Sequence, residues 1–399
     1  MSSATRHAII AGAGIGGLCA ALALARAGLR VSVFERAPLI EEAGAGIQLP
    51  PNAMRALDTL GLGETLRARA DATQGLHVRA LGNGQSLMRL PQAAMQARWG
   101  APSLVMHRAD LARLLLEAIA LTPGISVATG MAVAGFAAGV DAVSVALRRG
   151  LMRQQVAGDL LIGADGLRSA VRAAPQDSAS DHLRFSGSFA WRALVEAERL
   201  PASLRTPETA LWLGPKLHLV HYPLRHGALV NVVAVLAGGA PAVPAKDEWN
   251  VPGEAAVIHA AFRQAAPQAR ALIAAADSWR IWPLYDRLPP PGWTQGRTAL
   301  LGDAAHPMLP YLAQGAAQAI EDAVALAAAL KGNGDTAAAL VTYARARLVR
   351  TSEVVRQSRR QGAIYHLAGP AALVRNLVMR YSSQDRLLGR LDWLYAPHS

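Results

Sequence analysis

A glycine-rich loop at Gly12–Gly17 lies between two short apolar runs and strongly limits what this chain can fold into. Residues 7–11 before the loop have the pattern of a buried strand, and a helical pattern follows at 18–27. A second predicted strand at 31–34 ends at Glu35. The G-x-G-x-x-G spacing in this strand–loop–helix–strand context predicts a Rossmann-like unit that binds a dinucleotide.

The glycines of this spacing have separate physical tasks. Gly12 permits a tight turn, Gly14 lets the backbone approach a pyrophosphate, and Gly17 allows the helix to pack closely on the strand. The helix start offers free N–H groups to phosphates, and the Glu35 carboxylate can accept hydrogen bonds from a ribose. The alternative is a glycine-rich turn without a ligand. The residues predicted to contact the dinucleotide here are Gly12, Gly14, Ile15, Gly16, Gly17, Glu35 and Arg36.

Two later glycine-bearing segments narrow the choice of nucleotide, which the first loop alone does not settle. Gly163–Ser169 follows an apolar stretch at 156–163 that predicts one buried strand. Gly302–Pro307 follows a predicted strand at 298–301, and a helical pattern at 316–330 begins soon afterwards. An acid at the end of this strand can bind ribityl hydroxyls, and the helix start can face the pyrimidine side of an isoalloxazine. The three segments in this order predict FAD.

Seven segments spread along the chain carry a family resemblance: Gly44–Ala53, His107–Leu111, Ala190–Arg192, His218–Pro223, Gly302–Pro307, Gln314–Asp322 and Leu391–Tyr395. On these segments the chain resembles, over nearly its whole length, the class A flavoprotein monooxygenases, the family of p-hydroxybenzoate and salicylate hydroxylases. Its last stretches most resemble the branch of salicylate 1-hydroxylase, 3-hydroxybenzoate 6-hydroxylase and 6-hydroxynicotinate 3-monooxygenase.

The resemblance implies roles for individual residues. Glu35 is expected to hold the adenosine ribose, Arg108 to lie near the FAD phosphates, and Asp165 to serve FAD and NAD(P)H. Asp303 is expected to hold the ribityl chain, and Pro307 to approach the reactive carbon of the flavin. Gln48 and Gln314 could meet the flavin edge or the substrate. The cofactor contacts predicted beyond the first loop are Gln48, Arg108, Asp165, Asp303, Pro307, Gly315 and Ala316.

The spacing of these segments predicts an α/β fold in which the FAD-binding domain is discontinuous. We expect a Rossmann-like FAD-binding domain, an inserted substrate-binding domain built on an antiparallel sheet, and a C-terminal helical segment. The inserted sheet is expected to contain strands at 188–195, 209–213, 217–222 and 229–236. The predicted ranges are 1–74, 101–174 and 283–345 for the first domain, 75–100 and 175–282 for the second, and 346–399 for the C-terminal segment.

The segment His218–Tyr222 is the predicted site of substrate chemistry. In a strand, His218, Val220 and Tyr222 share one face, whereas His221 points to the other face and is assigned a structural role. An imidazole and a phenol on one face suit the binding and deprotonation of a phenolic substrate. His218 is the better base at neutral pH because an unperturbed histidine has a pKa of about 6.5. The alternative is a His–Tyr pair that only stabilises the sheet.

The activity that follows from the resemblance is aromatic hydroxylation. NADH or NADPH would reduce FAD, and a flavin C4a-hydroperoxide formed with O2 would attack an electron-rich ring, possibly with loss of CO2. The expected substrate is a small phenolic acid of the salicylate, hydroxybenzoate or hydroxynicotinate type. Alternatives are epoxidation or hydroxylation of a non-phenolic substrate, or a non-catalytic flavin-binding protein. A halogenase would be expected to carry a catalytic lysine, and none of the lysines lies in such a motif.

Composition favours a soluble cytoplasmic enzyme. The sequence does not fix the oligomeric state, and a monomer or a homodimer is expected. The net charge of +12 comes mainly from arginines spread along the chain, which gives no nucleic-acid groove but favours encounter with anionic acids and pyridine nucleotides. No metal site is predicted from the eleven histidines.

Cys19, the one cysteine, is interpreted as core filler. His306 is interpreted as fixing its loop through backbone hydrogen bonds. The apolar and arginine-rich run at 371–395 is expected to pack its apolar side on the protein rather than on a membrane.

Overall fold

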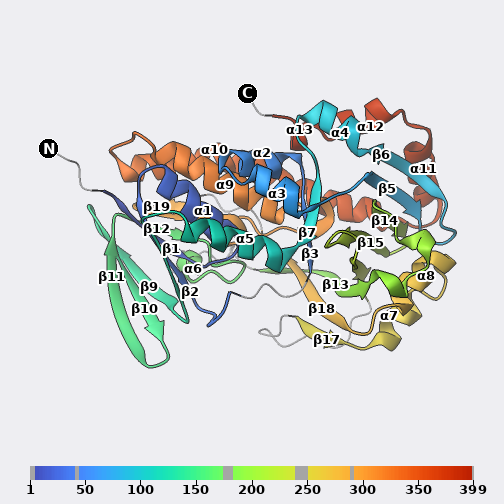
Figure 1. Ribbon diagram of the computed structural model, residues 1–399, viewed down its shortest axis with the longest axis horizontal. Helices are drawn as coiled ribbons and strands as arrows, with labels where there is room; N and C mark the ends of the chain where they lie inside the picture. Colours follow the sequence, from blue (N-terminus) through green and yellow to red (C-terminus); the bar gives the residue numbers. More distant parts are fainter. Residues whose placement is uncertain (1–4, 41–44, 174–182, 239–249, 288–291, 398–399) are drawn as a thin grey trace.

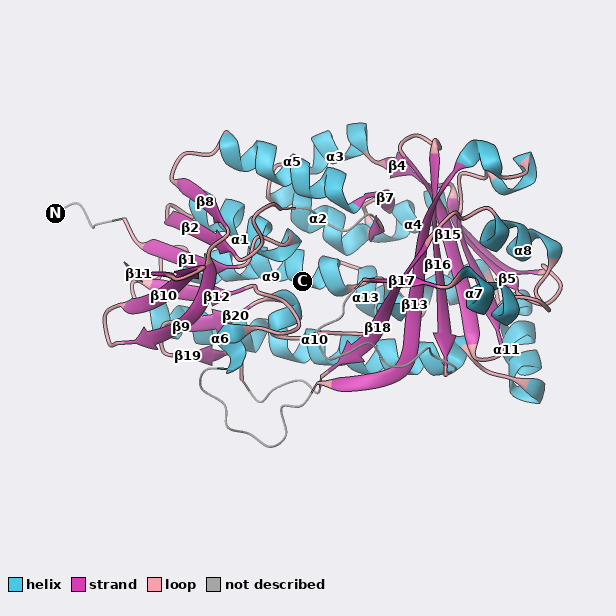
Figure 2. Cartoon of the chain, turned by 90° about the horizontal axis from the view of Figure 1, so that it is seen from below, coloured by secondary structure: helices cyan, strands magenta, loops and turns pink. Residues whose placement is uncertain are grey.

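The computed structural model describes residues 5–40, 45–173, 183–238, 250–287 and 292–397 (Figure 1). Two sheets lie toward opposite ends of the long axis, and helices occupy the space between and around them (Figure 2). One end holds a mainly parallel sheet of six strands, and the other holds a sheet of eight strands. The fold is therefore α/β, with a Rossmann-like core and a second, separate sheet.

The six-stranded sheet places the three predicted loops along one edge. Its strand order is β19-β20-β12-β1-β2-β8, and all pairs except β19–β20 are parallel. Ala11 pairs with Gly163, and Gly163 pairs with Leu300, so β1, β12 and β20 end at the same level. The carboxyl edge of a parallel sheet is where nucleotides bind. The strands are β1 His7–Ala11, β2 Arg30–Glu35, β8 Ile125–Thr129, β12 Leu160–Gly163, β19 Thr294–Gln295 and β20 Thr298–Leu300.

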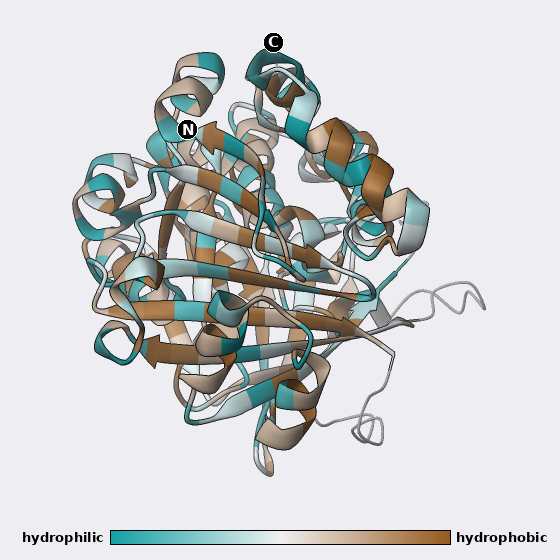
Figure 3. Ribbon diagram, turned by 90° about the vertical axis from the view of Figure 1, so that its right-hand side faces the viewer, coloured by the Kyte–Doolittle hydropathy of each residue, from teal (hydrophilic) through white to brown (hydrophobic). Residues whose placement is uncertain are grey.

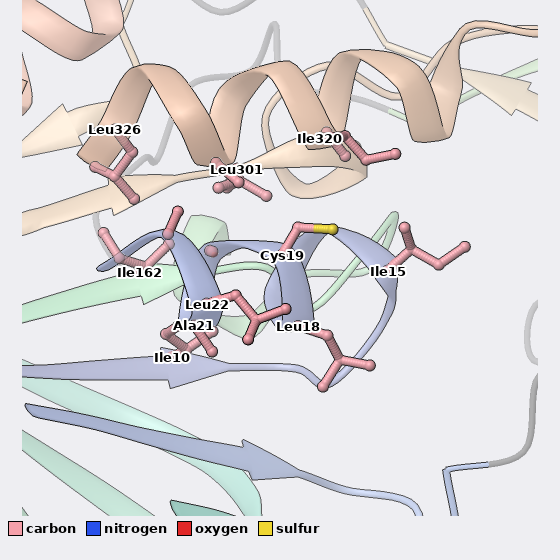
Figure 4. Close-up of a cluster of buried hydrophobic side chains, with 14 of the residues drawn as sticks. Ile10, Ile15, Leu18, Cys19, Ala21, Leu22, Ile162, Leu301, Ile320 and Leu326 are labelled. Atoms are coloured by element: carbon pink, nitrogen blue, oxygen red, sulfur yellow. The ribbon is translucent and has the colours of Figure 1, made fainter. Parts of the chain in front are cut away.

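The core of this region is a helix pair packed on the sheet. Helix α1 (Ile15–Arg26) lies between the strands and α9 (Gly315–Leu330), and small residues on both helices allow close approach (Figure 4). Cys19 of α1 is fully buried in this packing, and burial raises the pKa of its thiol to about 12. The interpretation of Cys19 as core filler is confirmed.

The second sheet has the strand order β17-β18-β13-β16-β15-β14-β5-β6. One pair departs from the predicted antiparallel sheet, because β14 runs parallel to β5. The β5–β6 hairpin comes from a distant part of the chain, so no tight turn forces it to run against β14. The strands are β5 Gly75–Ala80, β6 Ser86–Pro91, β13 Arg184–Glu196, β14 Thr209–Gly214, β15 Leu217–Leu224, β16 Leu229–Ala237, β17 Val251–Gly253 and β18 Trp279–Asp286.

Each face of the second sheet has a different neighbour. Its outer face is covered by α7 (Ala255–Ala261) and α8 (Pro267–Ala274), which contribute to an apolar cluster around Trp191 and Trp212. Its inner face meets a three-stranded ribbon and the loop after β20. The strands of this ribbon are β3 Gly46–Leu49, β4 Asp71–Ala72 and β7 Leu104–His107.

The remaining elements complete the two regions. A three-stranded sheet contains β9 Ala132–Ala138, β10 Val143–Arg149 and β11 Met152–Gly158. The other helices before the C-terminal region are α2 Pro51–Thr59, α3 Gly63–Arg69, α4 Gln92–Trp99, α5 Arg108–Ala120 and α6 Ala170–Ala173. The C-terminal helices are α10 Thr336–Tyr365, α11 Gly369–Tyr381, α12 Gln384–Gly389 and α13 Asp392–Tyr395.

Two boundaries differ from the sequence predictions. The stretch at 156–163 is not one strand, because the chain passes from β11 to β12 at Asp159, whose carboxylate accepts a hydrogen bond from the His7 amide at 2.6 Å. Helix α10 also crosses the boundary expected at residue 345, since it is a continuous helix of 30 residues. The domain boundary expected at residue 174 lies outside the described residues.

The predicted orientation of the C-terminal run is wrong for α11 and correct for α12 and α13. Leu373 and Leu377 are 64% and 55% exposed, whereas Arg375 is only 8% exposed. The Arg375 guanidinium donates to the Ile364 and Tyr365 carbonyls at the end of α10, which turns this one arginine of α11 inward. Leu388 and Leu394 of the last two helices are buried. Figure 3 shows hydrophobic and hydrophilic residues interspersed along the helices near the C-terminus. No helix within the described ranges has the length and apolar character needed to cross a membrane.

Candidate active site

The first loop packs directly on the second. Gly12 has a φ of 100°, and a Cβ there would lie 2.5 Å from the carbonyl oxygen of Ala164. A Cβ at Gly17 would lie 2.0 Å from the Gly12 carbonyl oxygen. Both positions therefore require glycine for the protein's own packing, and the predicted tight turn and close helix approach are confirmed.

Gly14 differs from Gly12 and Gly17, because no contact within the described protein requires a glycine at this position. A Cβ on Gly14 would have no atom within 4 Å, and its φ of −69° suits any residue. Gly14 is the N-cap of α1, and within the described chain no side chain caps this helix start. The open space and the free N–H groups fit a pyrophosphate bound at the helix N-terminus.

Changing Gly14 to valine is expected to weaken FAD binding without unfolding the protein. The side chain would occupy the open space and cost about 1–3 kcal/mol of phosphate hydrogen bonding, or roughly 5- to 150-fold in Kd. FAD titration of the apoprotein measures this change, and urea unfolding should show a loss of no more than about 1 kcal/mol. Gly17→Ala is the matched control, which should destabilise the apoprotein itself. An unchanged FAD affinity in Gly14→Val would contradict the assignment.

Glu35 at the end of β2 stabilises the first loop through hydrogen bonds. Its carboxylate accepts hydrogen bonds from the Ala13 and Ala37 amides, both at 2.8 Å. Arg36 is exposed beside it. The structure thus gives Glu35 a structural task next to the loop, and its contact with a ribose stays a prediction.

Asp165 lies in the turn after β12, beside the first loop. One carboxylate oxygen accepts hydrogen bonds from the Ala170 amide at 2.7 Å and the Val171 amide at 3.3 Å, which caps α6. The other oxygen is buried and accepts no hydrogen bond from a described residue. Burial raises the pKa of this carboxyl, and the hydrogen bonds oppose that effect. The second oxygen is therefore the atom available to a nucleotide.

Asp303 follows β20 and lies next to the start of α9. Its Oδ1 is 3.9 Å from a Cβ placed on Gly315, the first residue of that helix, and no described side chain caps the helix start. The Asp303 side chain is exposed, yet surrounding protein raises its pKa, an effect that His306 and Arg108 oppose. Asp303, Gly315, Ala316 and Arg108 are thus brought together, and Pro307, four residues after Asp303, is buried. This arrangement fits a ribityl chain and a flavin ring.

A buried ionic network holds the Asp303 loop in place. Asp322 of α9 accepts hydrogen bonds from the His306 ring at 2.6 Å, the Gly302 amide at 3.0 Å and the Arg347 guanidinium at 2.7 Å. The predicted role of His306 in fixing the loop is confirmed, since its backbone amide donates to the Gly302 carbonyl at 2.9 Å. The ring bond to Asp322 adds a side-chain contact that was not predicted. Asp322 and Arg347 were not predicted to support this loop. The acidic residue inside the apolar pattern of α9 was the signal in the sequence for a buried ion pair.

Gln314 belongs to the same interior and not to the flavin edge. Its side-chain oxygen accepts hydrogen bonds from Asn52 at 3.0 Å and Gln318 at 2.9 Å, and the residue is fully buried. Gln48 lies on β3 with its neighbours Ile47 and Leu49 turned into the core. The Gln48 side chain therefore points away from that core, and of the two glutamines it is the one placed to meet a ligand.

The network should make stability depend on acid pH. Burial acts to raise the pKa values of Glu321 and Asp322, but Arg347, Arg350 and His306 hold both at about 2. Their folded pKa values lie below the ordinary 4.5 and 3.8, so their stabilisation is present above those values and is lost as pH falls toward 2. The urea midpoint should drop steeply between about pH 5 and pH 2, and less steeply in Glu321→Gln. A midpoint independent of pH in this range would contradict the network's role.

The inner face of the second sheet carries the predicted substrate residues. In β15, His218 and Tyr222 contact the apolar clusters on the side of the dinucleotide region, with Val220 between them. His221 lies on the outer face beside Trp212. The predicted division of the two faces is confirmed. The Cα atoms of His218 and Tyr222 are about 13 Å apart along the strand, so the two side chains mark opposite ends of a shared surface.

His218 is paired with a histidine that the sequence analysis did not select. Its Nδ1 lies 2.9 Å from Nε2 of His366, the residue after α10, and its ring packs against Tyr311 and Tyr365. Burial and the neighbouring His366 lower the pKa of His218 to about 3, far from the ordinary value assumed from the sequence. The His218 imidazole is therefore neutral at pH 7, and it can accept a proton from a phenol only when the bound anion offsets the burial.

Tyr222 lies against the β3–β7 ribbon. A Cβ on Gly46 would lie 2.6 Å from the Tyr222 hydroxyl, and the neighbouring Asn231 accepts a hydrogen bond from the Gly46 amide at 2.8 Å. Burial raises the pKa of the Tyr222 phenol, and the cation on Arg192 opposes this effect. Tyr222 therefore stays protonated and can act as a hydrogen-bond donor.

The three loops along the sheet edge and the imidazole–phenol face opposite them define a flavoprotein of the aromatic-hydroxylase class. Residues 5–358 match the family model described as FAD binding domain, and the chain belongs to this family. It binds FAD and is an aromatic monooxygenase.

Relatives and solved structures agree with this class. A 3-hydroxybenzoate 6-hydroxylase of Polaromonas naphthalenivorans is 40% identical and aligned over 97% of this chain and 95% of its own length. A 3-amino-4-hydroxybenzoate 2-monooxygenase of Streptomyces cremeus is 38% identical over 97% of this chain and 94% of that protein. The Klebsiella pneumoniae HpxO complex with FAD and uric acid has a TM-score of 0.85 at 27% identity, covering 98% of this chain and 97% of that one. A salicylate hydroxylase substrate complex has a TM-score of 0.82 at 26% identity, covering 99% and 96%.

Proposed function

We propose that this protein uses NAD(P)H and O2 to hydroxylate a phenolic acid of the 3-hydroxybenzoate type, at the carbon para to the phenolic hydroxyl. The observation that carries the proposal is the neutral, buried His218 on the sheet face that meets Tyr311, a few residues after the Gly302–Pro307 segment. The names of the relatives support the same substrate class, since several of them are 3-hydroxybenzoate 6-hydroxylases.

Different residues of the chain would bind the cofactor, move the proton and position the substrate. The first loop, Asp303 and the start of α9 would hold FAD, which supplies the activated oxygen once it is reduced. His218 would accept the hydrogen bond of the substrate hydroxyl and take its proton, which raises electron density at the para carbon. His366 can pass that proton onward because it is hydrogen-bonded to His218 and only half-buried. Tyr222 would donate a hydrogen bond at the other end of the substrate.

The proposal is tested by the oxidation of NADH and of NADPH in the presence of FAD and a panel of aromatic acids. We expect 3-hydroxybenzoate to speed the oxidation more than salicylate, 4-hydroxybenzoate or 6-hydroxynicotinate. No CO2 should be released from 3-hydroxybenzoate, because its carboxylate does not occupy the attacked carbon. If salicylate is preferred and CO2 is released, the decarboxylating reaction is correct instead. If no acid stimulates the oxidation, the phenolic-acid assignment is wrong.

A further inference from the structure

A serine, a histidine and a glutamate meet on the second sheet, away from the proposed site of hydroxylation. Nε2 of His77 in β5 lies 3.0 Å from the hydroxyl oxygen of Ser86 in β6, and Nδ1 of the same ring lies 3.1 Å from a carboxylate oxygen of Glu208. His77 pairs in register with Ala210 of β14, and Ala210 pairs with His221 of β15. Paired residues point to the same face of a sheet, so the three groups share the outer face with His221.

An irregularity in the β5–β6 hairpin brings Ser86 to this face. The register shifts so that Arg79 pairs with Ser86, which leaves Leu87 as an extra residue whose side chain is buried in an apolar cluster. Residues three positions apart in a regular strand point to opposite faces. Because of the extra residue, Ser86 and Arg89 both reach the His77 ring. Bulges of this kind redirect side chains next to active sites.

The partners of the His77 ring fix which of its nitrogens carries the proton. A carboxylate only accepts hydrogen bonds, so Nδ1, which faces Glu208, carries a hydrogen. A guanidinium only donates, and Nε of Arg89 lies 3.4 Å from Nε2, so Nε2 presents its lone pair. The hydroxyl of Ser86 is closer to that lone pair, and Ser86 is exposed to solvent. A hydroxyl, a basic nitrogen and an orienting acid in this sequence of contacts are the parts of an activated nucleophile.

Burial and charge keep the His77 ring neutral at pH 7. The side chain is only 1% exposed. Burial and the Arg79 cation lower the pKa of His77, the hydrogen bond to Glu208 opposes them, and Arg89 lowers the pKa further. Burial also lowers the pKa of the neighbouring His221 to about 3, so that residue adds no charge. The His77 imidazole is therefore free to take up a proton.

We propose that Ser86, with His77 as its base and Glu208 orienting the ring, is a nucleophile that takes the acyl group of an activated carboxylic ester and passes it to water. The Ser86 oxygen would attack the carbonyl carbon while its proton moves to Nε2 of His77, and the leaving alcohol would depart with that proton. Water would then attack the acyl group by the same route, which releases the acid and restores the serine. Arg89, beside Nε2, is the cation that can stabilise the oxyanion.

The test is the reaction of the FAD-loaded protein with a fluorophosphonate, located by peptide mass spectrometry, together with hydrolysis of p-nitrophenyl acetate. We expect the label on Ser86 and a rate of labelling that falls by at least about 10²-fold in His77→Gln. Ser86→Ala should lose both reactions, and its flavin absorbance and urea midpoint should show that it folds. Ser383 is the matched control, because it is exposed and its oxygen accepts a hydrogen bond from the Arg386 amide. Ser383→Ala should leave both rates unchanged.

Glu208→Gln separates an orienting role from a structural one. The amide can still accept a hydrogen bond from Nδ1, but the charge that raises the His77 pKa is lost. The maximal rate of labelling should fall, and its rise with pH should move to lower pH. An unchanged profile would mean that Glu208 does not act on the ring.

A label no faster on Ser86 than on Ser383, or a rate unaffected by both His77→Gln and Glu208→Gln, would overturn the inference, because the three residues would then only stabilise the hairpin. If His77→Gln does not fold, the comparison rests on Ser86→Ala and Glu208→Gln. Neither reagent needs reduced flavin or an aromatic acid, so this result is independent of the proposed function.

Discussion

Replacing His218 with asparagine is expected to lower kcat by about 10²- to 10⁴-fold, the usual contribution of a general base. The reason is that His218 is the buried imidazole on the inner sheet face, and its Nδ1 lies 2.9 Å from Nε2 of His366, which could take the proton onward. Asparagine keeps a polar group of similar reach but cannot take up a proton. FAD affinity should not change, since the loops proposed to hold FAD follow strands of the other sheet.

The measurement is steady-state kinetics with 3-hydroxybenzoate, together with flavin absorbance as a readout of bound cofactor. His221→Asn is the control, because His221 lies three residues further along the same strand and faces the outer side. It should keep kcat within about threefold of the wild type if it folds, as expected for a residue away from the chemistry. A His218→Asn enzyme with nearly normal kcat would show that the histidine pair only stabilises the sheet.

Replacing Asp322 with alanine is expected to reduce the free energy of unfolding by about 3–5 kcal/mol, the cost of breaking a buried ion pair. The substitution would leave Arg347 buried without its partner and would free the Gly302 amide and the His306 ring. Because those groups fix the loop that carries Asp303, FAD affinity should fall as well.

Urea unfolding of the apoprotein and FAD titration measure the two effects separately. The control is Glu353→Ala, which removes a surface ion pair with Arg356 and should cost about 0–1 kcal/mol. A loss below about 1 kcal/mol in Asp322→Ala would mean that the loop is held by backbone packing and not by the ionic network.

The cofactor side of the site could be predicted because its signals are local. Gly12 and Gly17 are required by contacts within a few residues or with the adjacent loop, and the ends of parallel strands necessarily meet at one edge. The alternation of His218 and Tyr222 followed from the period of a strand in the same way. Each of these inferences needed only the neighbouring residues.

The remaining parts depend on contacts between distant residues. His366 contacts His218 although the two are 148 positions apart in the sequence. Burial, together with this neighbour, lowers the pKa of His218, which was expected at its ordinary value from the sequence. Arg375 turns inward because the end of α10 offers it carbonyl oxygens, which reverses the orientation expected from an amphipathic pattern. The parallel pairing of β14 with β5 likewise joins two segments that share no local signal.

The most direct test of the whole account is the product formed from 3-hydroxybenzoate under ¹⁸O₂ with NAD(P)H and FAD. We predict 2,5-dihydroxybenzoate that carries one ¹⁸O atom in the new hydroxyl and retains its carboxylate. Oxidation of NAD(P)H that yields only reduced oxygen species, or a product without the label, would contradict the assignment of this protein as a hydroxylase of phenolic acids.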